Sequence, residues 1–168
     1  MKKAIVVVLA LAAVLVPAAL ATAPAQDPAD YCKAHPELIG QGKLYKNMGQ
    51  CVAKQTAQSD QNTVNAAKTC KAQKSDANFA ANHGGKTFAQ FYGTNGDKGN
   101  GKGAANGKGN AFGKCVSGMA SGKTAQQQTA QVNAAKKCRT APLKDQIGTA
   151  PKTYRNFGAC VAAQTKTS

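Results

Sequence analysis

The sequence predicts a mainly α-helical fold, built from small helical repeats that disulfides hold together, with a flexible insertion rich in Gly, Lys and Asn. Two stretches, 52–69 and 116–137, are rich in Ala, Gln, Lys and Thr and contain no Pro, which favours helix. Six cysteines recur in similar phrases. Large apolar side chains are scarce, which excludes an extensive hydrophobic core, a transmembrane enzyme and a nucleotide-binding α/β domain with continuous Val/Ile strands.

Residues 1–25 have the pattern of an export signal. A basic start, Lys2-Lys3, precedes an apolar run over 4–20, and small residues follow up to Ala25. The apolar run is shorter than the roughly 20 residues that span a bilayer, so removal is favoured over a membrane anchor. Cleavage within 21–25, favoured after Ala25, predicts a secreted, extracellular protein. Its formal net charge falls from +15 to +13, because the two lysines leave with the signal.

The mature chain, 26–168, repeats a phrase of an apolar residue, Gly, any residue, Cys and Val. The phrase occurs at Met48–Val52, Phe112–Val116 and Phe157–Val161. A second phrase, Asn-Ala-Ala-Lys with a cysteine two residues later, occurs twice. We therefore divide the chain into three units, each opening at Cys-Lys or Cys-Arg and closing at Gly-x-Cys-Val. The units run over 32–51, 70–115 and 138–160.

Helix is expected in both connectors between the units. Polar stretches at 59–62 and 121–124 are candidate breaks, because Ser, Asp and Gly suit caps and turns. Each connector is therefore predicted to be either a single helix or a helical hairpin.

The middle unit is the longest of the three. Two short helical turns with aromatic anchors are expected at 78–81 and 86–92, and we expect their rings to fill a small core. Residues 93–110 hold seven glycines and no large apolar side chain, so nothing there offsets the entropy of ordering. We predict that this segment is a flexible insertion.

The six cysteines are expected to form disulfides, because an exported chain with a small core relies on them. If the connectors are single helices, Cys51 and Cys70 lie about 28 Å apart. Bridged Cα atoms lie within about 7 Å, so this pairing is then excluded. The pairs would be those within units, which we favour: Cys32–Cys51, Cys70–Cys115 and Cys138–Cys160. Hairpin connectors would instead give Cys51–Cys70, Cys115–Cys138 and Cys32–Cys160.

No catalytic or metal-binding arrangement is recognisable. Structural zinc sites bring cysteines in pairs about two to four residues apart, whereas the nearest cysteines here are 19 apart. His35 precedes a proline and His83 precedes two glycines, so both are expected on surface turns. Glu37 is the only glutamate, and the aspartates are scattered. We therefore predict a protein that is not an enzyme, with no catalytic residue, no metal site and no cofactor.

The excess of 22 Lys and Arg over 7 Asp and Glu predicts attraction to polyanions. Anionic polymers or surfaces outside the cell are the expected partners, with Lys98, Lys102 and Lys108 of the insertion as candidate anion-binding residues. No nucleic-acid-binding motif is present, which disfavours specific reading of DNA or RNA. The connectors lack the apolar face that stable membrane insertion requires. The same charge can also serve only to keep an alanine-rich protein soluble.

The phrases at Asn65–Lys71, Phe91–Asn95 and Asn110–Ser117 resemble a group of secreted bacterial cysteine-repeat proteins that have no assigned activity. The resemblance covers most of 65–140, whereas the first and third units lack the Phe-Tyr-Gly-Thr-Asn phrase. It implies secretion and a repeat scaffold, and it supplies no catalytic residue. The expected function is non-enzymatic binding to anionic polymers. The alternative is a small secreted effector, either a toxin or an inhibitor.

Overall fold

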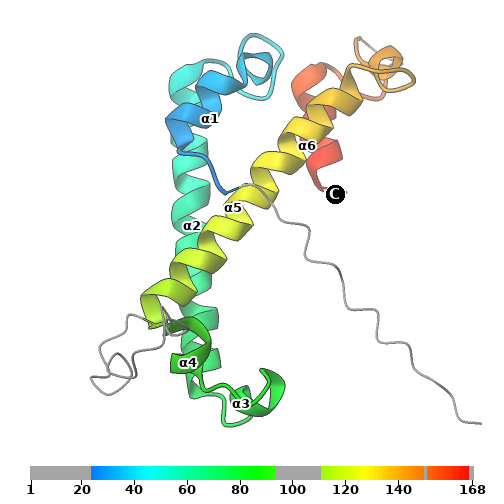
Figure 1. Ribbon diagram of the computed structural model, residues 1–168. Coiled ribbons are helices and arrows are strands. Elements are labelled where there is room, and N and C mark those ends of the chain that lie inside the picture. The colour runs from blue at the N-terminus through cyan, green and yellow to red at the C-terminus, as the bar shows by residue number, and fades with distance from the viewer. Residues whose placement is uncertain (1–23, 94–110, 150, 167–168) are drawn as a thin grey trace, which may run out of the picture.

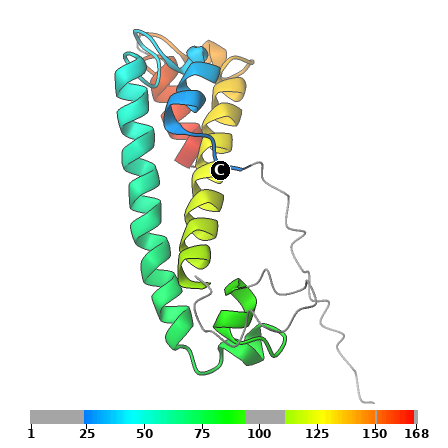
Figure 2. The same cartoon turned by 60° about the vertical axis from the view of Figure 1, so that its left-hand side comes forward.

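The computed structural model describes residues 24–93, 111–149 and 151–166. Two long helices form its centre, α2 (Met48–Ser75) and α5 (Ala111–Cys138), which lie side by side and run in opposite directions (Figures 1 and 2). The predicted mainly α-helical fold is confirmed. Most of the export signal, and the insertion with Lys98, Lys102 and Lys108, fall outside the described residues.

Shorter helices lie at the two ends of the central pair. The helices α1 (Pro28–Ala34) and α6 (Phe157–Lys166) pack at one end, and α3 (Phe79–Asn82) and α4 (Phe88–Gly93) lie at the other (Figure 1). Two 3₁₀ turns, Pro36–Leu38 and Lys144–Gln146, belong to the end that holds α1 and α6. Each long helix therefore spans the distance between two small clusters of elements.

Asparagine side chains begin two of the helices. Asn47 accepts a hydrogen bond from the backbone N–H of Gln50 at 2.8 Å, and the Gln50 side chain accepts from the N–H of Lys46 at 2.6 Å. This reciprocal pair satisfies two donors at the start of α2. Asn156 likewise accepts from the N–H of Ala159 at 2.8 Å at the start of α6. The first and third copies of the repeated phrase thus begin one residue after a helix cap.

Both connectors are single helices, so the candidate breaks at 59–62 and 121–124 do not interrupt them. The polar side chains there bond across the helix pair. The Asn62 side-chain amide donates to the Thr124 hydroxyl at 3.0 Å, and that hydroxyl donates to the carbonyl of Ala120 at 2.9 Å. Because these groups find partners within helical geometry, they do not compete with the helix backbone.

The three disulfides join the cysteines within units, as favoured from the sequence. The pairs are Cys32–Cys51, Cys70–Cys115 and Cys138–Cys160, with Cα–Cα distances of 6.0, 6.0 and 6.1 Å. Each bond links a residue in the last turns of one helix to a residue in the first turns of a later one. The disulfides therefore close the three turns of the chain and leave the long helices outside the closed loops.

The apolar core is divided between the two ends of the molecule. The end with α1 and α6 buries two disulfides together with Tyr31, Leu38, Tyr45 and Val161. The other end buries the Cys70–Cys115 disulfide with Phe79 and Phe88. The rings of Phe79 and Phe88 lie 5.5 Å apart in an edge-to-face arrangement and fill a small core as expected, whereas Phe91 is 44% exposed.

The first and third turns share one backbone conformation. Ile39 forms an isolated parallel bridge with Tyr45, and Ile147 forms the same bridge with Tyr154. The residues after the two isoleucines are Gly40, with φ of 137°, and Gly148, with φ of 145°, a region that L side chains rarely adopt. Glycine is therefore required at both positions.

The first turn also contacts α6, through Gly158. Its backbone N–H donates to the carbonyl of Gly42 at 2.8 Å. A Cβ on Gly158 would overlap the Lys43 carbonyl and lie 2.9 Å from the backbone nitrogen of Leu44. This close approach holds α6 against the turn that precedes α2.

Candidate functional site

All six cysteines are buried and paired. Each has a relative exposure of 0–1%, and no free cysteine is present in the described part of the chain. A nucleophilic or metal-binding thiol is therefore not offered by these six residues. Among residues 24–93, 111–149 and 151–166, no three His, Cys, Asp or Glu side chains approach closely enough to hold a metal ion.

Both histidines lie at turns, as expected, and both are partly exposed: His35 lies between α1 and the first 3₁₀ turn, and His83 directly follows α3. The His35 ring packs 4.7 Å from the Tyr31 ring, and its Nδ1 lies 2.9 Å from Glu37 Oε1. His83 stacks on Phe79 at 3.8 Å and its Nδ1 donates to the carbonyl of Phe79 at 2.8 Å. Both imidazoles are partly buried because a neighbouring aromatic ring lies one helical turn before them. Both therefore stabilise local structure.

Glu37 belongs to the same local structure as His35. Burial alone would raise the pKa of Glu37, but the hydrogen bonds from its own backbone amide and from His35, with the charges of His35 and Arg139, together lower it. The carboxylate is thus held in its ionised form by groups of the fold. It pairs with His35 and supports the turn before α2.

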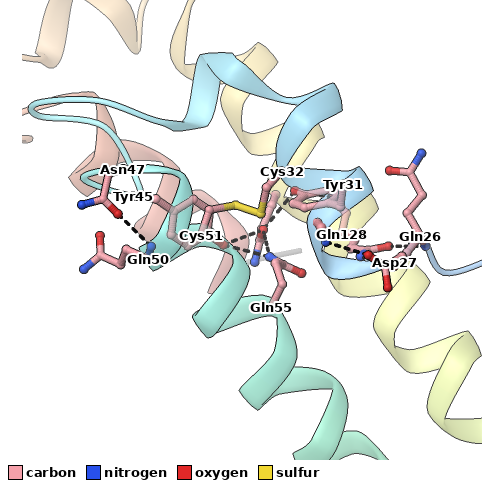
Figure 3. The surroundings of a disulfide bond; sticks show 12 residues. Gln26, Asp27, Tyr31, Cys32, Tyr45, Asn47, Gln50, Cys51, Gln55 and Gln128 are labelled. Atoms are coloured by element: carbon pink, nitrogen blue, oxygen red, sulfur yellow. Dashed lines mark hydrogen bonds between the residues drawn. A yellow bond between two sulfur atoms is a disulfide. The ribbon is translucent and has the colours of Figure 1, made fainter.

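A buried polar network lies beside the Cys32–Cys51 disulfide (Figure 3). The side-chain oxygen of Gln131 accepts from the hydroxyls of Tyr31 and Tyr45, both at 3.0 Å, and from the amide of Gln55 at 2.9 Å. Gln55 is 1% exposed. Every buried side-chain nitrogen and oxygen among the described residues has a partner. The network therefore joins α1, α2 and α5 through amides and phenols rather than through large apolar groups.

The network predicts a loss of stability in alkaline solution. Burial raises the pKa of Tyr31 well above its ordinary value, with further contributions from Tyr45 and Glu37, and burial also raises the pKa of Tyr45. The unfolded tyrosines ionise first, at about pH 10. The unfolded state then binds fewer protons than the folded state, so the free energy of unfolding falls as the pH rises above about 10. Denaturant titrations at pH 8 to 11 measure this fall.

The control for this prediction is the double variant Tyr31→Phe/Tyr45→Phe. Lysine titration is common to both proteins, so the difference between their pH profiles isolates the two phenols. We expect the variant to be less stable at pH 8, by about 1 kcal/mol for each lost hydrogen bond. Its stability should also fall less steeply with pH than that of the natural protein. Parallel profiles would contradict the assignment.

A groove of about 810 Å³ runs between α2 and α5. Six polar side chains of α2 line it at spacings of three and four residues, which places them on one helix face. They are Gln50, Lys54, Gln58, Gln61, Asn65 and Thr69. We call this set the α2 stripe. Met119, Lys123 and Gln127 face it from α5.

The floor of the groove is the contact between the two helices. Asn62 is 7% exposed, and its side-chain amide donates to Thr124 and to Gln127, the latter at 2.6 Å. Ala66 and Leu44 add small apolar surfaces to the lining. The floor is thus held in place by hydrogen bonds that cross from α2 to α5.

Cationic side chains of the groove have no acidic partner. Among the residues that the structure describes, the lining contains Lys54 and Lys123 and no carboxylate. Over the described residues, the one ion pair of a lysine or arginine with a carboxylate joins Lys33 and Asp30 at 3.8 Å, and both side chains are more than two-thirds exposed. The two ammonium groups of the groove are therefore available to an anion from solution.

The groove was not predicted from the sequence. The α2 stripe has a helical spacing that could have been found, but nothing in the sequence shows which face of α5 meets it. The lysines chosen from the sequence, Lys98, Lys102 and Lys108, lie outside the described residues, so their role stays a prediction.

No family model, curated protein or solved structure matches the chain. The resemblance to secreted cysteine-repeat proteins stays a prediction.

Proposed function

We propose that the protein is a secreted, non-enzymatic binder of anionic polymers or surfaces outside the cell. One observation carries the proposal: the cationic side chains of the central helices have no carboxylate partners among the described residues. The helix α5 contains no acidic residue, and α2 contains only Asp60. Their lysines are Lys54, Lys68, Lys71, Lys74, Lys114, Lys123, Lys136 and Lys137.

Some of these lysines also have a structural role. Lys74, Lys136 and Lys137 lie in the last turns of their helices, where a positive charge interacts favourably with the helix dipole. Lys54 and Lys123 lie farther from the helix ends, so the dipole does not account for them. Attraction of a polyanion accounts for these two lysines, because unpaired ammonium groups along two adjacent helices create a positive potential.

Secretion is part of the proposal. The export signal over 1–25 supports it, and so does the use of all six cysteines in disulfides, which persist in oxidising compartments. In the part of the chain that the structure describes, no helix combines the length and the apolar character needed to cross a bilayer.

Salt dependence tests the binding. The oxidised protein should be retained on dextran sulfate at about 50 mM salt and not on uncharged dextran. Its affinity should fall about tenfold or more by about 200 mM salt. Binding releases counterions from the polymer, and added salt opposes this release and also screens the charges. Equal retention on the two matrices, or binding that salt does not weaken, would contradict the proposal.

A further inference from the structure

The groove between α2 and α5 offers two kinds of recognition group in one place. Lys54 and Lys123 supply positive charge, and the other members of the α2 stripe supply side-chain amides and a hydroxyl. An amide both donates and accepts hydrogen bonds, whereas an ammonium group only donates. A ligand that uses the whole lining must therefore carry negative charges and also groups that donate and accept.

The two charges are separated along the groove. Lys54 precedes Asn62 by eight residues, which is about 12 Å along α2. Lys123 directly precedes Thr124, which accepts the hydrogen bond of Asn62 at 3.0 Å. The two lysines thus lie at levels about 12 Å apart, with Gln58 and Gln61 between them on α2. An elongated ligand fits this order, with an anion at each end and hydrogen-bonding groups between.

The amides between the lysines are not all used by the fold. Gln61 donates to Asn65 at 3.2 Å, and Gln127 accepts from Asn62 at 2.6 Å. The side-chain amide of Gln58 forms no hydrogen bond within the described part of the chain, and the residue is only partly exposed. Its amide therefore lies in the groove with both of its hydrogen-bonding groups open to a ligand.

Deepening the function proposed above, on which this inference rests, we propose that the groove binds a linear acidic polysaccharide whose sugars carry carboxylates. Lys54 and Lys123 bind two carboxylates of the chain, and Gln58 with its neighbours binds the hydroxyls between them. The apolar atoms of Leu44, Ala66 and Met119 contact the C–H faces of the sugar rings.

A nucleic acid fits the same groove less well. The aromatic side chain of the lining, Tyr45, is 6% exposed, and its hydroxyl is engaged by Gln55 and Gln131. It therefore presents no open ring on which a base could stack. The described lining of the groove also contains no arginine, the residue that binds phosphate in a bidentate manner. The amide oxygens of the lining would find no donor on a plain phosphate backbone, which only accepts hydrogen bonds.

The test compares a groove variant with a matched control. Lys54→Gln/Lys123→Gln removes two charges from the groove, and Lys71→Gln/Lys137→Gln removes two from the same helices outside it. We expect the groove variant to bind oligogalacturonate about tenfold or more weakly than the natural protein, because charge-assisted hydrogen bonds are lost. The control should lose about twofold, since exposed charges are largely screened. Thermal unfolding of both variants shows whether each is folded.

A third variant, Gln58→Ala, separates recognition of hydroxyls from attraction of charge. It should weaken binding of oligogalacturonate about fivefold and binding of linear polyphosphate by about twofold or less, because polyphosphate accepts from the amide N–H but has no hydroxyl to donate to the amide oxygen. Binding of polyphosphate that is tighter than that of oligogalacturonate and depends on Gln58 would overturn the inference.

The remaining outcomes are distinct. Failure to bind either polymer at low salt contradicts the proposed function itself. Binding of both polymers with equal losses in the groove variant and the control keeps the proposed function and rejects the groove as its site. Concentration-dependent dimerisation that the groove substitutions abolish would assign the groove to a second copy of the chain instead.

Discussion

Reduction of the three disulfides is expected to unfold the protein. The closed loops have sequence separations of 19, 45 and 22 residues. On the chain-entropy model, closing each loop stabilises the fold by about 3–4 kcal/mol, or about 10 kcal/mol in all. This total equals the whole stability of a typical domain. The non-covalent contacts alone should therefore not keep the helices together at room temperature.

The thin core is the physical reason. The two apolar clusters lie at opposite ends of α2 and α5, and each is built around disulfides. Between them, the helices meet through small and polar side chains such as Asn62, Ala66 and Thr124. Once the sulfur–sulfur bonds are broken, each turn gains chain entropy and little apolar surface remains to oppose it.

Far-UV circular dichroism of the reduced and alkylated protein measures the effect, with the oxidised protein as reference. Paired substitutions identify the contribution of each bond: Cys32→Ala/Cys51→Ala, Cys70→Ala/Cys115→Ala and Cys138→Ala/Cys160→Ala. We expect loss of the Cys70–Cys115 bond, which closes the 45-residue loop, to destabilise the fold most. A cooperative thermal transition with full helical signal after complete reduction would contradict the prediction.

Substitution of Gly158 by alanine is expected to destabilise the fold by about 3 kcal/mol, at the upper end of the cost of overpacking. The added Cβ would lie 2.5 Å from the carbonyl carbon of Lys43, so the turn before α2 must move away from α6. That movement also breaks the hydrogen bond from Gly158 to Gly42. Urea unfolding of the oxidised variant measures the loss.

The matched control is Gly49→Ala, which occupies the same position of the repeated phrase at the start of α2. A Cβ there has one neighbour within 4 Å, the Asn47 side-chain oxygen at 3.6 Å, which is ordinary contact. We expect unchanged or slightly greater stability, because alanine favours helix over glycine by up to about 1 kcal/mol. Equal effects of the two substitutions would show that the contact of α6 with Lys43 carries no stability.

The helical content of the connectors was predictable because it depends on local composition, and the complete repeat units favoured the disulfide pairs within units without excluding the alternative set. The choice between a single helix and a hairpin was not predictable, since Asn62 and Thr124 have the same turn-forming tendency in either case. Their partners decide it, and those lie on the other helix. The face of α5 that meets α2 could not be predicted either. Its buried residues include Thr124, Gln128 and Gln131, so the sequence of α5 shows no apolar periodicity.

The placement of the disulfides has a consequence for proteolysis. The segments 35–47, 76–110 and 139–156 of the sequence each lie between two bonded cysteines. A protease that cuts the backbone once within any of these segments produces two ends that stay covalently joined through sulfur. One cut in each of the three segments still leaves a single molecule. Between Cys32 and Cys160, a single cut separates two fragments only where it falls between Cys51 and Cys70 of α2 or between Cys115 and Cys138 of α5. There the helical backbone resists the extended conformation that proteases bind.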